Sequence, residues 1–211
     1  MTLPRLYPIL DTASLAARTC PVETAAQAML DGGARILQFR HKGHFSRDVF
    51  AQAERVRAMC RGTGALFVID DRADIAMLLD CGLHVGQDDL PPSDARRLIG
   101  ANRLLGFSTH NIEQLKSAAE EPVDYLAIGP IFQTGSKRNP DPVLGLAELK
   151  TLRAAVQKPL VAIGGITREN ARAVLDAGAD SVAVIADLLP EVCDHDNVRA
   201  RMAEWQQLLN K

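Results

Sequence analysis

The chain has 211 residues, of which 47% are hydrophobic and 24% are charged. This length and composition provide a sizeable core for one large domain or two small ones and exclude disorder over most of the chain. The 24 basic and 26 acidic side chains give a formal net charge of −2, which excludes the global positive field that binds nucleic acid or an anionic membrane. An anionic ligand would therefore need a local cluster of basic groups.

The sequence contains no segment typical of a membrane anchor and no closely spaced cysteines. No apolar run approaches the roughly 20 residues that span a bilayer, and Arg5, Asp11 and Arg18 interrupt any signal-peptide core. We therefore expect a soluble, cytoplasmic protein. The cysteines form no CxxC pair, which argues against a zinc or redox motif and favours reduced thiols; they are Cys20, Cys60, Cys81 and Cys193.

Strand-like and helix-like segments alternate along the chain. Short apolar runs typical of buried parallel strands are predicted at residues 6–11, 36–40, 66–70, 83–86, 104–108, 125–129, 160–164 and 182–186. Segments with helical periodicity are predicted at residues 21–30, 46–61, 73–79, 93–99, 112–119, 146–155, 168–176 and 198–209. Ser46 and Asn111 are expected to cap two of these helices, with Gln114 placed for a capping box.

This alternation predicts an α/β fold, a closed (β/α)₈ TIM barrel that forms a single compact domain over residues 1–211. No Pro/Ser-rich linker divides the chain. The alternative is an open doubly wound sheet, but the first strand lacks the GxGxxG turn with which such sheets bind dinucleotides. Polar residues also gather at the C-terminal ends of the predicted strands, which is where barrels build their active sites.

The second strand ends in alternating long polar side chains. Gln38, Arg40 and Lys42 would point to the same side of an extended segment. If that side faces inward, a guanidinium, an ammonium and an amide surround one volume, which suits a diphosphate. A solvated strand exit with salt bridges is the alternative, but buried Arg and Lys on one face are costly without an anion.

Two acidic pairs, Asp70-Asp71 and Asp88-Asp89, follow the third and fourth strands. Neighbouring barrel strands would bring these carboxylates together, and clustered carboxylates repel one another unless a cation bridges them. Hard oxygen ligands beside phosphates suit Mg²⁺. For each acid taken alone, a helix cap or a loop position remains the alternative.

The longest break in the alternation, residues 132–145, is rich in turn formers and is predicted to be a lid. Lys137 in this loop would neutralise a leaving phosphate when the lid closes. The alternative is a solvated basic turn.

The seventh strand ends in Gly164-Gly165, which leaves backbone N–H groups open to close approach before a helix begins. Together with Ile185-Ala186 after the eighth strand, this turn matches the place where barrels often hold a phosphate. Glycines that simply permit tight packing are the alternative.

The histidines carry a weaker signal. His84 and His110 fall at strand ends, but neither has the Ser or Cys and the acid that a nucleophilic triad requires. A structural imidazole is at least as well supported as a catalytic one. Trp205 lies at helical spacing from Leu208 and Leu209, which predicts ordinary packing.

Taken in order, these segments resemble the thiamine phosphate synthase family, from the strand with Tyr7 to Ala186. The matching segments are LQFRHK (37–42), VIDDRADIA (68–76), GLHVGQDD (82–89), GFSTH (106–110), DYLAIGPIFQTGSK (124–137) and PLVAIGGIT (159–167). The resemblance implies a (β/α)₈ transferase that joins hydroxymethylpyrimidine diphosphate to a thiazole phosphate and releases pyrophosphate, with Mg²⁺ as cofactor.

The resemblance also implies roles for particular residues. Gln38, Arg40 and Lys42 look like the diphosphate and pyrimidine site, Asp70 stands where the family usually has Asn, and Asp71 and Asp89 look like the Mg²⁺ ligands. Further implied contacts are Ser108 and Lys137 to the pyrimidine diphosphate, Thr134 and Ser136 to the thiazole, and Gly165, Ile185 and Ala186 to the thiazole phosphate, where Ala186 replaces a frequent Ser. Arg40, Lys42 and Lys137 would be catalytic, because they stabilise charge on the leaving pyrophosphate.

Two other functions remain open from the sequence. A thiazole tautomerase-type isomerase shares the barrel but lacks the metal-binding acids, and would use His110 as its acid and base. A non-catalytic barrel that binds a phosphate ligand would keep the basic and glycine sites without metal-dependent turnover. Small-molecule substrates are the expected partners, and a homodimer is compatible with a small barrel, although no residue indicates an interface.

Overall fold

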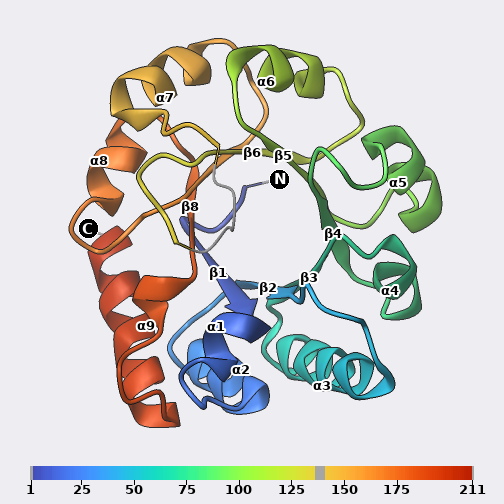
Figure 1. Cartoon of the computed structure of the whole chain (residues 1–211), viewed down its shortest axis with the longest axis vertical. Coiled ribbons are helices and arrows are strands. Elements are labelled where there is room, and N and C mark those ends of the chain that lie inside the picture. Colours follow the sequence, from blue (N-terminus) through green and yellow to red (C-terminus); the bar gives the residue numbers. More distant parts are fainter. Residues whose placement is uncertain (1, 136–140, 211) are drawn as a thin grey trace.

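The sheet is a closed barrel in the computed structural model, which describes residues 2–135 and 141–210. Parallel strands pair in chain order and β8 pairs with β1, while the helices lie around the outside (Figure 1). The strands in this described part are β1 (Leu6–Asp11), β2 (Ile36–Arg40), β3 (Leu66–Asp70), β4 (Gly82–Val85), β5 (Leu105–Thr109), β6 (Tyr125–Ile128), β7 (Leu160–Ile163) and β8 (Ser181–Val184). The predicted α/β barrel is confirmed, and strand boundaries differ from prediction by at most two residues.

Helices follow the strands as the hydrophobic periodicity predicts. They are α1 (Thr12–Ala16), α2 (Val22–Asp31), α3 (Arg47–Thr63), α4 (Ala73–Leu78), α5 (Pro92–Ile99), α6 (Ile112–Ala119), α7 (Gly145–Ala154), α8 (Ala171–Asp176), the 3₁₀-helix η1 (Ala186–Leu188) and α9 (His195–Leu209). Both predicted caps form, because Ser46 Oγ accepts from the N–H of Val49 and Asn111 Oδ1 accepts from the N–H of Gln114. The Gln114 side chain accepts from His110 N–H, one residue before the position that a capping box uses.

Two short helices and the starts of two helices differ from the sequence-based expectation; α9 begins at His195 rather than at residue 198. The short helices α1 and η1 were not predicted, because five and three residues are too few to show helical periodicity. Helix α8 was predicted to begin at residue 168 but begins at Ala171. Asn170 accepts from the N–H of Thr167 and donates to the carbonyl of Gly165, so its side chain stabilises a turn before the helix.

The hydrophobic core has two parts. The larger lies between the sheet and the helices, and the smaller contains alternate strand residues such as Tyr7, Ile36, Val68 and Tyr125, which fill the barrel interior. Because strand side chains alternate between faces, the interior row of β2 that starts at Ile36 continues through Gln38 and Arg40. The interior is therefore apolar near the N-terminal ends of the strands and polar near their C-terminal ends.

No helix in the described ranges, 2–135 and 141–210, is both long and apolar enough to cross a bilayer.

Trp205 on α9 is fully buried in the core between the sheet and the helices. Its substitution should therefore lower the stability of the protein measurably. The Trp205→Ala variant should lose about 3–5 kcal/mol of unfolding free energy, because it leaves a large cavity. The exposed Gln207 on the same helix offers a matched control, and Gln207→Ala should stay within about 0.5 kcal/mol. Urea unfolding followed by far-ultraviolet circular dichroism measures both, and equal losses in the two variants would contradict the assignment.

Candidate active site

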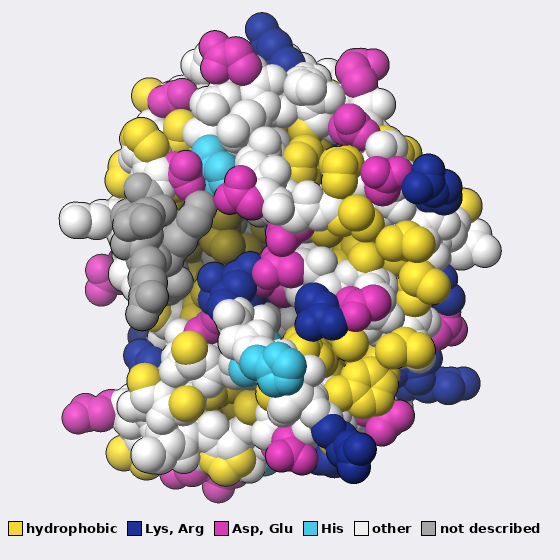
Figure 2. All heavy atoms as spheres, turned by 45° about the vertical axis from the view of Figure 1, so that its right-hand side comes forward, with side chains coloured by type: hydrophobic (Ala, Val, Ile, Leu, Met, Phe, Trp, Pro, Cys, Tyr) yellow, Lys and Arg dark blue, Asp and Glu magenta, His cyan; other side chains and the backbone are white. Residues whose placement is uncertain are grey.

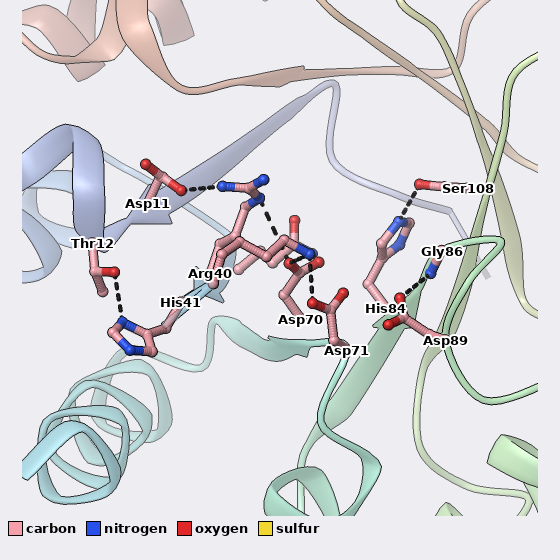
Figure 3. Close-up of polar contacts among 12 residues, drawn as sticks. Asp11, Thr12, Arg40, His41, Asp70, Asp71, His84, Gly86, Asp89 and Ser108 are labelled. Carbon is pink, nitrogen blue, oxygen red and sulfur yellow. Dashed lines mark hydrogen bonds and ion pairs between the residues drawn. The ribbon is translucent and has the colours of Figure 1, made fainter. Parts of the chain in front are cut away.

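Two basic side chains at the C-terminal end of β2 face a cluster of carboxylates (Figure 3). The register of β1 and β2 places Asp11 beside Arg40, and Arg40 Nη1 donates to Asp11 Oδ2. Arg40 Nε lies 3.6 Å from Asp70 Oδ2. Lys42 Nζ lies 2.8 Å from the same Asp70 oxygen and also donates to Asp71 Oδ2. Five side chains, from β1, β2, β3 and the residues just after β2 and β3, are thus connected by ion pairs.

Neighbouring charges and hydrogen bonds control the protonation of Lys42 and Asp11. Burial alone would lower the pKa of Lys42, but the carboxylates of Asp70 and Asp71 outweigh burial and raise it. Burial alone would raise the pKa of Asp11, but hydrogen bonds from Ser14 and the Arg40 guanidinium lower it. Lys42 therefore remains a cation and Asp11 an anion at neutral pH.

Gln38 lies one step deeper in the barrel than Arg40, on the same face of β2. Its Nε2 donates to Asp70 Oδ1 at 2.9 Å, so Asp70 holds the amide of Gln38. The three predicted residues Gln38, Arg40 and Lys42 all contact Asp70. Asp70 is thus the centre of this polar cluster.

Asp71 and Asp89 form a close pair of carboxylates at the ends of β3 and β4. Burial raises the pKa of Asp89, and the nearby Asp71 carboxylate raises it further, against a hydrogen bond from the N–H of Gly86. Asp71 adopts a left-handed backbone with φ of 62°, a conformation that is costly for a residue other than glycine. Figure 2 shows Asp or Glu and Lys or Arg side chains meeting at a hollow on one face of the molecule.

The carboxylate pair has the donor chemistry of a Mg²⁺ site. No group of three or more His, Cys, Asp or Glu residues within the described ranges is arranged to hold a metal. Mg²⁺ commonly takes one or two carboxylates and completes its shell with water and substrate phosphates, so two acids would suffice if phosphate oxygens lay beside them. Burial is the main cause of the raised pKa of Asp89 and the Asp71 carboxylate adds to it; a divalent cation would relieve the repulsion between the two carboxylates.

A row of hydrogen-bonded side chains crosses the barrel interior beside the charged cluster. The hydroxyls of Tyr7 and Tyr125 are 2.7 Å apart, and Tyr125 OH lies 3.0 Å from His84 Nδ1. His84 Nε2 in turn lies 2.8 Å from Ser108 Oγ (Figure 3). Burial, helped by the positive charge of Lys42, lowers the pKa of His84 to about 4. The imidazole is therefore neutral at neutral pH.

His110 has a different environment. Its Nδ1 lies 2.7 Å from the carbonyl oxygen of Gly129 and 3.4 Å from Asp141 Oδ2. The carbonyl can only accept, so Nδ1 carries a proton and donates to it. This contact ties His110 to the start of the loop after β6.

The glycine turn after β7 packs against that same loop. Gly164 and Gly165 have φ of 99° and 63°, and a Cβ on Gly165 would lie 2.4 Å from the carbonyl oxygen of Gln133. These glycines therefore permit tight packing, which was the alternative explanation for their presence. The N-terminus of η1 lies at Ile185-Ala186, and a short extra helix after strand eight is a common part of phosphate sites in barrels.

The comparisons with known proteins agree with this geometry. A family model described as thiamine monophosphate synthase matches residues 6–188. The chain belongs to the thiamine-phosphate synthase family. A thiamine-phosphate synthase of Koribacter versatilis is 48% identical over 100% of this chain and 98% of its own length, and one of Chloroflexus aurantiacus is 40% identical over 98% and 93%. A solved thiamine phosphate pyrophosphorylase from Pyrococcus furiosus superposes with a TM-score of 0.84 at 30% identity, covering 98% of this chain and 96% of that one.

The structure brings most of the residues predicted from the thiamine-phosphate synthase resemblance to one end of the barrel. Gln38, Arg40, Lys42, Asp70, Asp71, Asp89 and Ser108 lie at the ends of β2 to β5. Thr134 lies in the loop after β6, while Gly165, Ile185 and Ala186 follow β7 and β8. Ser136 and Lys137 lie outside the described residues, so their predicted roles stay predictions.

Sequence reasoning missed several polar residues of this thiamine-phosphate synthase site. Asp11 was treated as a strand end, and Tyr7 and Tyr125 were not singled out. The available signal was that these are the only two tyrosines in the chain, each within a strand that must contribute side chains to the barrel interior. Gly106 was also missed, although a Cβ there would lie 2.0 Å from Tyr125 Cζ.

The neutral His84 predicts a pH effect on stability. An unfolded chain binds a proton at this histidine near its ordinary pKa of 6.5, whereas the folded protein resists until about pH 4. Stability should therefore fall as the pH drops through 6.5, by about 1.4 kcal/mol per unit and about 2 kcal/mol by pH 5.

The measurement is urea unfolding at pH 7 and pH 5 in wild type, His84→Gln and His44→Gln. The His84 variant should lose this contribution to the pH dependence, and the variant at the exposed His44 should retain it. A wild type whose loss between pH 7 and pH 5 equals that of His84→Gln would contradict a buried neutral His84.

Proposed function

We propose that this member of the family is a thiamine phosphate synthase. It condenses 4-amino-2-methyl-5-(diphosphooxymethyl)pyrimidine with a thiazole phosphate, and the products are thiamine phosphate and pyrophosphate. The observation that carries the proposal is the single cluster in which Arg40 and Lys42 meet the acids at the ends of β3 and β4. Such a cluster supplies the charges that departure of a pyrophosphate requires.

Arg40 and Lys42 provide complementary stabilisation for the leaving group. The guanidinium of Arg40 offers a planar set of donors that matches phosphate oxygens, and Lys42 offers a compact charge. Asp11 and Asp70 hold both cations in place without ligand, so little reorganisation is needed as negative charge develops on the pyrophosphate. Loss of that pyrophosphate leaves a methylene cation, which the electron-rich aminopyrimidine stabilises.

Asp71 and Asp89 would hold the Mg²⁺. The bound ion supplies Lewis-acid stabilisation of the diphosphate oxygens. Lys42 donates to the Asp71 oxygen, so the protein links the proposed metal ligand directly to a residue of the diphosphate site. The left-handed backbone of Asp71 fixes the direction in which this carboxylate leaves the end of β3.

The second half of the reaction needs no general base. The attacking thiazole nitrogen carries no proton, so the bond to the methylene carbon forms without proton transfer. This agrees with the absence of a triad around His110 in the described residues, where Nδ1 is bound to the Gly129 carbonyl. A tautomerase-type isomerase would need that imidazole as its acid and base, and it would not need the acids at positions 71 and 89.

The other substrate contacts are extensions of this proposal. Ser108 and Lys137 would contact the pyrimidine diphosphate, and Lys137 would add positive charge near the leaving group. Thr134 and Ser136 would contact the thiazole. Its phosphate would lie at the backbone of Gly165 and at Ile185-Ala186, where the N-terminus of η1 offers N–H groups. A cytoplasmic location, a homodimer and one domain over residues 1–211 also stay predictions.

A direct assay tests the function. Purified protein with both substrates and Mg²⁺ should release thiamine phosphate and pyrophosphate in equal amounts, measured by fluorescence after oxidation to thiochrome and by a coupled pyrophosphate assay. The same mixture without the thiazole phosphate is the control. Isomerisation of a thiazole phosphate without condensation would favour the tautomerase, and ligand binding without any product would favour the non-catalytic barrel.

The carboxylate pair has its own test. Asp71→Asn and Asp89→Asn should each lower kcat/KM by about 10²-fold or more and raise the Mg²⁺ concentration needed for half-maximal rate, because each removes charge at the proposed metal. Asp88→Asn, at the exposed neighbouring acid, is the matched control. An unchanged Mg²⁺ dependence in the first two variants would refute the ligand assignment.

A further inference from the structure

The row of Tyr7, Tyr125, His84 and Ser108 has one buried end and one end that faces the site. Tyr7 and Tyr125 are 2% and 1% exposed, His84 is buried, and Ser108 is half-buried near the C-terminal end of β5. Burial raises the pKa of both phenols, so each keeps its proton. The four groups come from β1, β6, β4 and β5, and none of them belongs to the ion-pair cluster.

The direction of the hydrogen bonds follows from counting protons. Two phenols, one hydroxyl and one neutral imidazole carry four protons for the three hydrogen bonds of the row. One proton therefore remains for a partner outside the row. It resides on Ser108 if His84 donates to Ser108, and on Tyr7 or Tyr125 if Ser108 donates to His84.

Burial decides between these two directions. Within the described residues, the hydroxyls of Tyr7 and Tyr125 have hydrogen-bond partners only inside the row, so a remaining proton on either would be an unsatisfied buried donor, which is costly. The opposite direction leaves the proton on Ser108, at the mouth of the barrel. Tyr7 then donates to Tyr125, Tyr125 donates to His84 Nδ1, and His84 Nε2–H donates to Ser108 Oγ.

The packing around Tyr125 fixes this arrangement. A Cβ on Gly106 would lie 2.0 Å from Tyr125 Cζ and 2.4 Å from its hydroxyl oxygen, so the phenol occupies space that only a glycine leaves open. The His84 ring stacks on the Tyr125 ring, with centroids 5.6 Å apart and an interplanar angle of 25°. Both partners of the central hydrogen bond are therefore held in place by neighbouring atoms.

We propose that Tyr125 and His84 are positioning residues that make Ser108 a dedicated hydrogen-bond donor to an acceptor atom of the pyrimidine diphosphate. The identity of that ligand rests on the proposed function, whereas the direction of the row does not. His84 is neither the acid nor the base of the reaction in this scheme. It accepts from Tyr125 at one nitrogen, donates at the other, and so prevents Ser108 from turning its proton inward.

The direction of the row is tested on the ligand-free protein. Long-range proton–nitrogen correlation spectra of ¹⁵N-histidine-labelled protein, with His84→Gln used for assignment, should show His84 protonated at Nε2 and unprotonated at Nδ1. Tyr125→Phe removes the donor to Nδ1 and should reduce this preference. A wild-type His84 protonated at Nδ1 would overturn the proposal, whether or not the protein is a synthase.

The consequence for the substrate is tested by steady-state kinetics. Ser108→Ala and Tyr125→Phe should each raise KM for the pyrimidine diphosphate about tenfold, the value of one hydrogen bond to a charged or strongly polar acceptor. The double variant should lose no more than Ser108→Ala alone, because both changes remove the same donor.

Tyr7→Phe is the matched control, since it deletes one buried hydroxyl but leaves Tyr125 able to donate to His84. Its KM should stay within about twofold of wild type even if its thermal stability falls. Additive effects of Ser108→Ala and Tyr125→Phe, or equal KM changes in the two tyrosine variants, would show that the tyrosines act through stability alone.

Discussion

Closure of eight parallel strands into one barrel is the constraint on which the rest of the structure depends. It forces alternate side chains from every strand into a shared interior, so residues far apart in the sequence, such as Tyr7 and Tyr125, come within hydrogen-bonding distance. The interior near the N-terminal ends is filled by apolar side chains. Polar and charged groups can then gather only at the other end, where all carboxyl ends of the strands meet.

At that end of the barrel, positive and negative side chains form ion pairs with one another. Arg40 and Lys42 are each paired with carboxylates. A diphosphate bound here, as proposed, would compete with these pairs or share them. The arrangement lowers the desolvation penalty of two closely spaced cations and keeps them oriented, at the expense of some affinity for the incoming anion.

The sequence predicted the barrel well because its evidence is local. The strands at residues 6–11, 36–40 and 66–70 and the helix at 112–119 match the structure, since each has a clear apolar pattern and a turn or cap at its end. Strand alternation also predicted that Gln38, Arg40 and Lys42 share one side, whereas their common contact with Asp70 was not predicted.

Other parts of the site could not be predicted because they depend on spatial register. The contact of Asp11 with Arg40 requires the pairing of β1 with β2. The His84 to Tyr125 hydrogen bond spans strands that are not neighbours and crosses the barrel interior. Helices α1 and η1 are too short for any periodicity to show. The roles predicted for residues 136 and 137 rest on the sequence and on the family resemblance, because both residues lie outside the described part of the chain.

The close approach of Gly106 to Tyr125 has an evolutionary consequence. Because a single added carbon at position 106 would overlap the phenol ring, neither position is free to change by itself. A larger residue at 106 is compatible with this barrel only when position 125 has already become small, and a small residue at 125 removes the hydroxyl that lies next to His84. In related proteins, the residues at positions 106 and 125 should therefore change together. A glycine at 106 is expected wherever a tyrosine is kept at 125.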